Sequence, residues 1–509
     1  MNSHVNTSLE KLDSTLEKEG VFRVVKQLRQ HFPSARIYLV GGTIRDALLR
    51  RDSKTDRDLV VCNVPAKELE DFLGTLGDVS LVGKHFGVFK LVPAHFGQVG
   101  IHATAVIDIA LPRTEHALMT GGYHDFNVQS DPDLPIEKDL ERRDFTINAM
   151  AYDLLEHRVV DVFDGSRDLE IKCIRTVGVP SRRFAEDFTR LLRAVRFACQ
   201  LSFDIEAETF TEMKGMSETI RKLPVERVRE EFNKILMSDQ AERGVRLLQE
   251  VGLLRHIARE LEDGIGVTQN KNHIYTVYEH NVRALGHATE RGYSLEVRLA
   301  ALFHDVGKPM TKQGEGYNST FHGHDIVGGR LTREILTRLK YPNDTINLVS
   351  HLVRHHMFYY SIGEVTDAGV RRLLVRLGSE NIENFLRVRI CDRLGMGRPK
   401  AKPYKLTELE RRLQEVQMDP IAPKMLALNG NDVMNLLSIM PGPRIGLLTR
   451  ALLGEVLDDP KRNTKDYLSQ RVRELDALSD EDLKKMTPDV EHYDRQRKEE
   501  FFIKYKEVE

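Results

Sequence analysis

The sequence predicts an α/β head followed by an entirely helical remainder. Short runs rich in β-branched and aromatic residues occur near the start of the chain, at 35–40, 58–61, 86–92 and 105–110. A helical pattern at 43–51 separates the first two runs, which indicates a mixed sheet with helices packed on it. From about residue 166 the strand pattern disappears, and amphipathic helices are predicted at 184–200, 225–237 and 241–251.

These patterns divide the chain into five predicted parts. They are an N-terminal extension (1–20), the α/β head (21–165), a helical neck and body (166–268), a histidine-rich helical domain (269–400) and a helical tail (401–509). Prolines break the tail into short, highly charged helices. The tail carries no recognisable chemistry, and a solvated helical surface is the default expectation for it.

Composition excludes several classes of protein. The 509 residues suffice for about three domains of ~150 residues, and no apolar run approaches the ~18 residues of a membrane helix. The four cysteines are far apart and form no CxxC pair, which argues against a disulfide framework and a zinc ribbon. With no secretory signal pattern at the start of the chain, we expect a cytoplasmic protein. The net charge of −2 excludes a globally basic nucleic-acid binder but allows a local basic face.

A glycine pair follows the first predicted strand. Gly41 and Gly42 lie between the run at 35–40 and the helix that begins at Thr43. Exposed backbone N–H groups in such a turn can hold a triphosphate, although the same pattern also forms ordinary tight turns.

Paired carboxylates begin the second predicted strand. Asp56 and Asp58 are spaced i, i+2 and therefore point to one face of a strand, where two like charges favour a bound cation. Magnesium suits such hard oxygen ligands and can activate an attacking 3′-hydroxyl. Asp108, central in an apolar run, is a candidate third carboxylate, because a mid-strand charge is costly without a partner. A solvated strand end is the alternative interpretation of the pair.

Five ordered motifs across about residues 20–255 resemble the superfamily of class II tRNA nucleotidyltransferases and bacterial poly(A) polymerases. They are LVGGTIRD (39–46), DRD (56–58), ERRDFTINAM (141–150), EDFTRLLRAVR (186–196) and LPVERVREE (223–231). The resemblance implies a polymerase-β-like nucleotidyltransferase head in which Gly41, Gly42, Arg45 and Asp46 bind the triphosphate, and Asp56 and Asp58 bind Mg²⁺. It also implies that Arg142, Arg143 and Asp144 contact the ribose, and that Asn148, Arg193 and Arg196 belong to the nucleotide site.

Base selection can be argued from chemistry as well. On the predicted helix 184–200, Asp187 and Arg190 are spaced i, i+3 beside an apolar stripe. Cytosine and adenine both present an amine donor next to a ring-nitrogen acceptor, which match a carboxylate and a guanidinium. Guanine and uracil present the opposite order and would leave both groups unpaired, at ~1–3 kcal/mol each. An ordinary surface ion pair is the alternative. The motif resemblance favours a protein template for CTP and ATP.

The stretch 113–125 shows no clear period and contains Gly121-Gly122. It lies where the resembling family carries a flexible loop that helps to switch from C to A addition. Arg113 and Asp125 are equal candidates for a role in it.

The middle of the chain resembles the HD superfamily of metal-dependent phosphohydrolases over roughly 273–395. The resemblance is carried by His280, the sequence HDVGKP at 304–309, and Asp392. It implies a metal held by His280, His304, Asp305 and Asp392, with a divalent transition metal favoured by the mixed ligands and magnesium as the alternative. His324 and His355 occupy positions of second-metal ligands in some members, and His351 and His355 share a helix face. Lys308 either holds a substrate phosphate or faces solvent. A retained fold without hydrolytic activity, serving as a tRNA platform, is the alternative for this domain.

The sequence thus predicts a template-independent enzyme that adds CCA from CTP and ATP to tRNA 3′ ends, with a possible metal-dependent phosphohydrolase activity in the HD domain. Its expected partners are the tRNA 3′ end and the two nucleotides, with no membrane and no obligate protein partner indicated. A CC-adding enzyme, an A-adding enzyme and a poly(A) polymerase share the motifs and remain alternatives. An HD phosphohydrolase whose head only binds RNA is a further alternative. A non-catalytic RNA-binding module is another, but the carboxylates at 56 and 58 argue against it.

Overall fold

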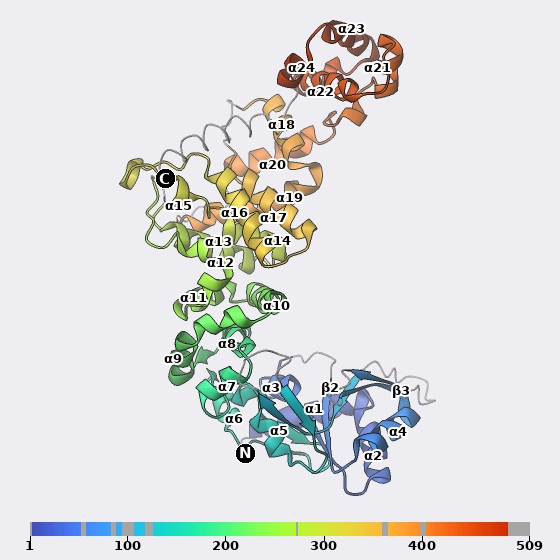
Figure 1. Ribbon diagram of the computed structural model, residues 1–509, viewed down its shortest axis with the longest axis vertical. Coiled ribbons are helices and arrows are strands. Elements are labelled where there is room, and N and C mark those ends of the chain that lie inside the picture. Colours follow the sequence, from blue (N-terminus) through green and yellow to red (C-terminus); the bar gives the residue numbers. More distant parts are fainter. Residues whose placement is uncertain are drawn as a thin grey trace. The chain divides into compact units, whose positions relative to one another are not determined.

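The structure is a computed structural model that describes residues 3–51, 57–82, 88–93, 106–117, 126–270, 273–358, 365–397 and 404–486. The chain divides into two compact units, 1–256 and 257–509. Strands gather in the first unit, and helices are the regular elements of the second unit's described residues (Figure 1). None of the described helices is both long and apolar enough to span a bilayer.

A seven-stranded mixed sheet forms the head, in the order β3-β4-β5-β2-β1-β8-β9. β2 pairs with β5 in parallel, and the other neighbours are antiparallel. The strands are β1 (Arg36–Val40), β2 (Arg57–Cys62), β3 (Gly77–Val82), β4 (Val88–Pro93), β5 (Ile107–Ala110), β8 (Ala151–Asp153) and β9 (Arg158–Val160). The helices of the head are α1 (Ser3–Lys18), α2 (Val21–His31), α3 (Gly42–Leu48), α4 (Ala66–Leu76), α5 (Ile136–Glu141) and α6 (Gly165–Glu170). The predicted α/β head is confirmed.

Two features of the head and neck differ from the sequence prediction. The stretch at 113–125 begins as a strand, because β6 (Arg113–Ala117) forms a hairpin with β7 (Phe126–Ser130); Asp125 lies outside the described residues. Strands also do not end at 166, since β10 (Cys173–Ile174) and β11 (Asp204–Ile205) form a short parallel pair. In both pairs the strands are too short or too irregular in sequence to show the alternation of apolar and polar residues that predicts a strand.

The neck follows with α7 (Pro180–Glu186), α8 (Thr189–Leu201), α9 (Ala207–Gly215), α10 (Val225–Leu236) and α11 (Ala241–Glu250). The prediction of a single helix over 184–200 is wrong, because Asp187 is extended (φ −147°, ψ 106°) and separates α7 from α8. The predicted apolar stripe is nevertheless buried. α8 packs against α10 and α11. A Cβ at Gly244 of α11 would lie 2.4 Å from Ile235 Cγ2 of α10, so the contact between α10 and α11 requires glycine.

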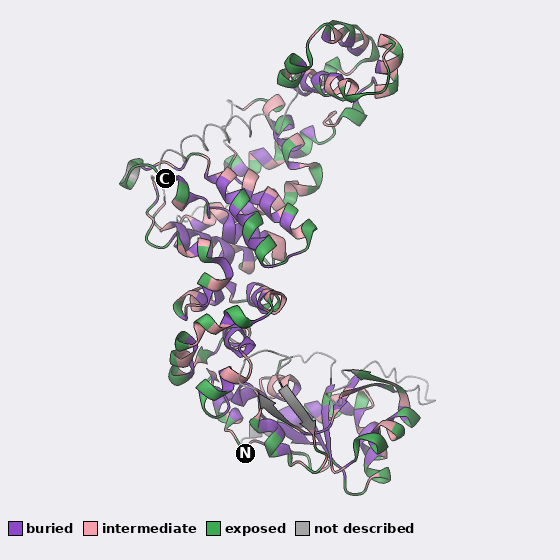
Figure 2. Ribbon diagram, in the orientation of Figure 1, coloured by how far each residue is buried: buried purple, intermediate pink, exposed green. Residues whose placement is uncertain are grey.

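The second unit contains the helices of the HD domain and then those of the tail. The first set is α12 (Leu254–Glu262, whose first residues lie in unit one), α13 (Val277–Glu290), α14 (Leu295–Phe303), α15 (Lys308–Thr311), α16 (His324–Arg338), α17 (Asn343–His355), α18 (Asp367–Leu377) and α19 (Ile382–Gly395). Buried residues concentrate where α13, α14, α16 and α17 face one another (Figure 2). The tail helices are α20 (Tyr404–Val416), α21 (Gly430–Leu437), α22 (Pro443–Asp458), α23 (Lys465–Asp476) and α24 (Asp480–Met486), and α21–α24 share a hydrophobic core.

Candidate active site and metal centre

The glycine turn lies directly against a carboxylate and a guanidinium. Gly41 follows β1 with φ 81°, a left-handed conformation that glycine adopts without strain. A Cβ at Gly41 would lie 3.3 Å from Asp58 Oδ2 and 3.6 Å from Arg143 Nη1. The turn, Asp58 and Arg143 therefore converge on one place.

Two of the three predicted catalytic carboxylates lie side by side on the sheet. β2 and β5 are parallel neighbours, and Asp58 is the register partner of Asp108, so both side chains lie on the same face. Lys90 on β4 lies 3.8 Å from Asp108 Oδ1 and offsets part of the charge. Asp56 lies outside the described residues. An acidic pair at this position provides the hard oxygen ligands that suit Mg²⁺.

A chain of hydrogen bonds runs from the glycine turn to the neck. Arg45 binds Asp46 through two nitrogens and donates to Asn148 Oδ1 at 2.7 Å. Asn148 donates to Asp144 Oδ1 at 3.0 Å, and Arg193 Nε donates to the other oxygen of Asp144 at 2.8 Å. Burial alone would raise the pKa of Asp144, but Arg193 and the Asn148 amide hold that pKa well below its usual value. These five predicted site residues form one hydrogen-bonded network.

The two arginines of the ERRD motif share the buried carboxylate of Asp139, which the sequence analysis did not single out. Arg142 donates to Asp139 Oδ1 at 2.7 Å, and Arg143 donates to Asp139 Oδ2 at 3.2 Å. Burial opposes ionisation of Asp139, but the two guanidinium groups lower its pKa below the usual range. The i, i+3 and i, i+4 spacing in the sequence DLERR was the available signal.

Three acceptors hold Arg190, two of them on α7 and one at the end of α5. Its guanidinium contacts the Glu186 carboxylate, the carbonyl of Arg183 at 2.8 Å and the carbonyl of Arg142 at 2.9 Å. Asp187 accepts from the Thr189 N–H at 2.8 Å at the start of α8. Asp187 is therefore extended and precedes α8, while its carbonyl accepts from the Arg190 N–H at 3.0 Å across the first turn. Glu186 is a further residue that the sequence reasoning did not single out.

One aromatic ring brings together arginines from two motifs. The Phe197 ring centroid lies 5.2 Å from the guanidinium carbon of Arg45, 5.4 Å from that of Arg193 and 4.1 Å from that of Arg196. Arg196 also donates to the buried Glu231 of α10 at 2.6 Å. This arrangement connects the glycine-turn motif to the helices of the neck.

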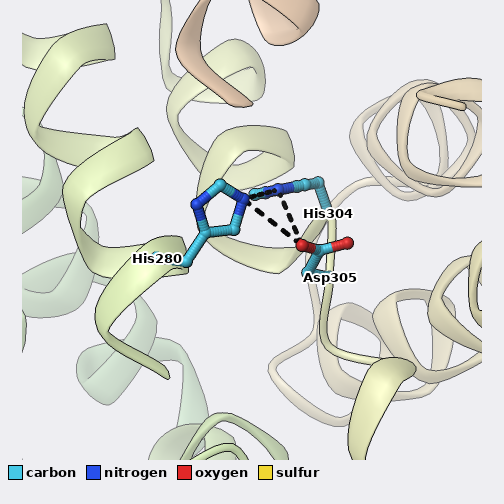
Figure 3. A group of neighbouring side chains, drawn as sticks. All are labelled: His280, His304 and Asp305. Atoms are coloured by element: carbon cyan, nitrogen blue, oxygen red, sulfur yellow. Dashed lines mark hydrogen bonds and ion pairs between the residues drawn. The ribbon is translucent and has the colours of Figure 1, made fainter. Parts of the chain in front are cut away.

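In the second unit, two histidines and two carboxylates meet. His280 Nε2 lies 2.9 Å from His304 Nε2, and each lies 3.3 Å from Asp305 Oδ2 (Figure 3). Asp392 Oδ1 lies 3.2 Å from His280 Nε2 and 3.6 Å from His304 Nε2. The four residues come from α13, the end of α14 and α19. The structure thus brings all four predicted HD residues together.

A second group uses the other oxygen of Asp305. His324 Nε2 and His356 Nε2 each lie 3.5 Å from Asp305 Oδ1, and the three residues are buried. The expectation for His324 agrees with this geometry, but His356 takes the place expected for His355. His355 instead packs on His351, with ring centroids 4.6 Å apart, while His351 Nε2 lies 3.0 Å from the carbonyl of Leu377. α17 ends at His355, and the next residue turns inward.

Backbone carbonyls orient three imidazoles of this cluster through their Nδ1 atoms. Nδ1 of His304, His324 and His356 lies 2.6–2.8 Å from the carbonyls of Ala301, Phe321 and Val353. A proton on Nδ1 leaves Nε2 as an acceptor, which is the tautomer that metal ligation requires. Nε2 of His324 and His356 is buried without a hydrogen-bond partner, so these residues fit a bound cation.

The charges of neighbouring groups in the cluster change the pKa of His304. Burial lowers the pKa of His304, but Asp305 and Asp392 outweigh that effect and raise it to about 10. Lys308 Nζ lies 2.5 Å from Asp305 Oδ2 and 2.6 Å from Gln269 Oε1. Lys308 is buried, so it does not face solvent, and Gln269 is a contact that the sequence reasoning missed.

Comparison with known proteins identifies the modules of the chain. Residues 37–175 match the poly A polymerase head domain, residues 202–265 match a probable RNA and SrmB-binding site of polymerase A, and residues 277–397 match the HD domain. These matches define the class as a polymerase-type nucleotidyltransferase that carries RNA-binding helices and an HD domain.

Curated relatives and solved structures narrow the class. The chain is 39% identical to the A-adding tRNA nucleotidyltransferase of Deinococcus radiodurans over 65% of this chain and 78% of the relative. It is 34% identical to the multifunctional CCA protein of Neisseria gonorrhoeae over 72% and 86% of the two chains. The chain belongs to the tRNA nucleotidyltransferase family. The fold resembles that of the Bacillus stearothermophilus CCA-adding enzyme, solved with CTP, at a TM-score of 0.63 and 22% identity over 94% and 98% of the two chains.

Proposed function

We propose that this protein adds C, C and A from CTP and ATP to tRNA 3′ ends. The observation that carries the proposal is the convergence of Gly41, Asp58 and Arg143, with Asp108 in register beside Asp58. In a member of this family, that arrangement supports a nucleotide site with a triphosphate at the glycine turn. Residues 21–165 would form the catalytic head, 166–268 the neck, 269–400 the HD domain and 401–509 the tail, after the extension at 1–20. The cytoplasm is the compartment we expect.

Each residue has a proposed task. Asp56, Asp58 and Asp108 would hold Mg²⁺, which when bound favours attack by the 3′-hydroxyl and neutralises the pyrophosphate leaving group. Gly41, Gly42, Arg45 and Asp46 would position the triphosphate. Arg142, Arg143 and Asp144 would hold the ribose, with Asn148, Arg193 and Arg196 supporting this network. Asp187 and Arg190 would select the base.

The relatives leave open which nucleotides are added, since one is named for A addition and another as a multifunctional CCA protein. The test offers purified protein two tRNA transcripts, one lacking CCA and one ending in CC, with labelled CTP and ATP. We expect three additions to the first transcript. Incorporation of A only, on the second transcript, indicates an A-adding enzyme, and incorporation of C only indicates a CC-adding enzyme. Long A tracts on primers other than tRNA indicate a poly(A) polymerase, and no incorporation overturns the proposal.

We propose a second activity, metal-dependent phosphoester hydrolysis, for the HD domain. It is supported by Nε2 of His324 and of His356, which are buried 3.5 Å from Asp305 Oδ1 and have no hydrogen-bond partner among the described residues. His280, His304, Asp305 and Asp392 would hold a divalent transition metal, with Asp305, His324 and His356 as a second position. When bound, such a metal lowers the pKa of a coordinated water.

The test for this activity measures hydrolysis of p-nitrophenyl phosphate and bis-p-nitrophenyl phosphate with Mn²⁺, Ni²⁺ or Mg²⁺. His304→Ala should abolish hydrolysis, and His287→Ala, which changes a half-buried histidine outside the cluster, should not. Metal binding without hydrolysis of either ester would support a structural role for the domain.

A further inference from the structure

Phe197 of α8 lies where three motifs of the candidate nucleotide site meet. Its side chain is buried, and its ring packs against that of Phe145 in a T-shaped arrangement, with centroids 5.7 Å apart and ring planes at 80°. Phe145 is fully buried and belongs to the motif at 141–150. The orientation of the Phe197 ring is therefore set by a second aromatic ring of the core.

Two of the three guanidinium groups around this ring are held by buried carboxylates. Arg193 Nε donates to Asp144 at 2.8 Å, and Arg196 Nε donates to Glu231 of α10 at 2.6 Å. Each carboxylate comes from a segment remote in sequence from its arginine. Charge-assisted hydrogen bonds of this kind hold both guanidinium groups in place on their own.

Arg45 is held differently. Its carboxylate partner is Asp46, the next residue on the short helix α3, and its other partner is the neutral side chain of Asn148, at 2.7 Å. The guanidinium lies against the glycine turn, since a Cβ at Gly42 would lie 3.2 Å from Arg45 Nη2. The Phe197 ring, centred 5.2 Å from the guanidinium carbon, joins this group directly to α8.

We propose that Phe197 is a positioning residue for Arg45 and, through Arg45, for the triphosphate, an inference that rests on the proposed function. An aromatic face attracts a guanidinium and leaves the N–H groups at its edge available for an anion. The ring thus orients Arg45 at the glycine turn without occupying a donor that phosphate oxygens can use. Phe197 itself contacts no reacting atom in this arrangement.

The central variant is Phe197→Met, which fills the space with a flexible apolar side chain and removes the aromatic face. The hydrogen bond from Arg51 Nη1 to the Gln200 carbonyl, 2.8 Å long, still joins the chain after α3 to α8. Equilibrium dialysis with labelled CTP and Mg²⁺ should show a Kd raised roughly tenfold. The Kd for CMP, measured by competition with labelled CTP, should stay within about twofold of the wild-type value, because CMP lacks the two phosphates farthest from the ribose.

Two further variants separate positioning from packing. Phe203→Met removes a buried ring just after α8 and should lower Tm while leaving the ratio of the two Kd values unchanged. Arg45→Met removes the cation instead of the ring. In the Arg45→Met background, Phe197→Met should cause little further change in the Kd for CTP, because the two side chains act as one unit.

The outcomes are distinct. An unchanged Kd for CTP in folded Phe197→Met overturns the inference, and so do equal losses for CTP and CMP, which indicate packing alone. Additive losses in the double variant overturn it as well, because Phe197 then acts other than through Arg45. If Phe197→Met does not fold, Phe197→Leu replaces it, and failure of both shows that the ring is needed for packing, which also overturns the positioning role. Failure of the wild type to bind or incorporate CTP overturns the proposed function instead, and is recognised before any variant is compared.

Discussion

The two ionisable clusters of the molecule balance their charges in opposite ways. In the head, Asp144 and Asp139 are buried but each is paired with arginines, and both pKa values lie below the usual range. In the HD domain, His324 and His356 direct buried nitrogens at Asp305 without a hydrogen bond on Nε2. The head network holds its shape through its own ion pairs, whereas the HD cluster leaves two buried imidazole nitrogens without a hydrogen-bond partner among the described residues.

This difference separates scaffold residues, which position their neighbours, from residues that would bind a cation. Paired charges such as Asp144 and Arg193 position neighbouring residues, and Asp58 and Asp108 beside them remain the groups that suit a cation. In the HD cluster the same residues would be scaffold and ligands at once. We therefore expect ion-pair substitutions to damage the head and cation removal to affect the HD domain.

The largest expected effect tests whether the two sites are chemically independent. Asp58→Ala should reduce nucleotide incorporation by about 10³-fold or more, because it removes a ligand from the metal that stabilises the transition state. Phosphoester hydrolysis by the same variant should remain at the wild-type rate. Asp78→Ala, an exposed position on β3, serves as the matched control and should leave both activities intact. Loss of hydrolysis in Asp58→Ala would contradict independence.

The next effect sharpens the assignment of Asp144 as scaffold. Asp144→Asn leaves Arg193 without its carboxylate, and we expect the free energy of unfolding of the head to fall by about 3–5 kcal/mol. Urea unfolding followed by circular dichroism measures it. Glu156→Gln breaks an exposed pair with Arg158 and should cause no measurable change. Equal stability of the Asp144→Asn variant and the wild type would show that the network is not a scaffold.

Metal removal tests the HD side of the comparison. With free metal at about 100 times its Kd, binding should stabilise the second unit by roughly 2.7 kcal/mol, which chelation removes. The apparent affinity should rise as pH increases from 6 to 9, because binding displaces the proton that His304 retains up to a pKa of about 10. Calorimetric unfolding with and without chelator, and proton release at two pH values, measure both effects. An affinity independent of pH would exclude His304 as a ligand.

The smallest effect concerns the link between the glycine turn and Asp144. Asn148→Ala removes the hydrogen bonds to Arg45 and Asp144, and kcat/KM for CTP should fall about tenfold, or ~1.4 kcal/mol. Asn431→Ala, an exposed residue of the tail, is the control. A change in Tm without a change in kcat/KM would limit Asn148 to a structural role.

Much of the fold was predictable because its signals are local. The runs that became β1 and β2 are continuous and apolar, and the motif residues of the head lie on them or next to them. β8 and β9 contain three residues each, which is too short for a period of two to be visible. The helix break at Asp187 was missed because the apolar stripe continues on both sides of it.

The site was less predictable where contacts are remote or neighbouring residues are alike. Arg196 and Glu231 are 35 positions apart, and no spacing rule joins them. His355 and His356 are the same residue type at adjacent positions, so only the end of α17 decides which one faces Asp305. Asp139 carried a usable helical spacing, but its burial depends on packing that the sequence does not display.

Asp305 presents one oxygen to His280 and His304 and the other to His324 and His356. If both groups hold a cation, a single bridging carboxylate makes the two binding equilibria cooperative in the thermodynamic sense. Each ion then changes the affinity of the other by the same factor, in whichever order they arrive. An ion at one position would therefore shift the titration midpoint of the other. Asp305→Asn would alter both affinities together, whereas His324→Ala would alter one directly and the other only through the shared ligand.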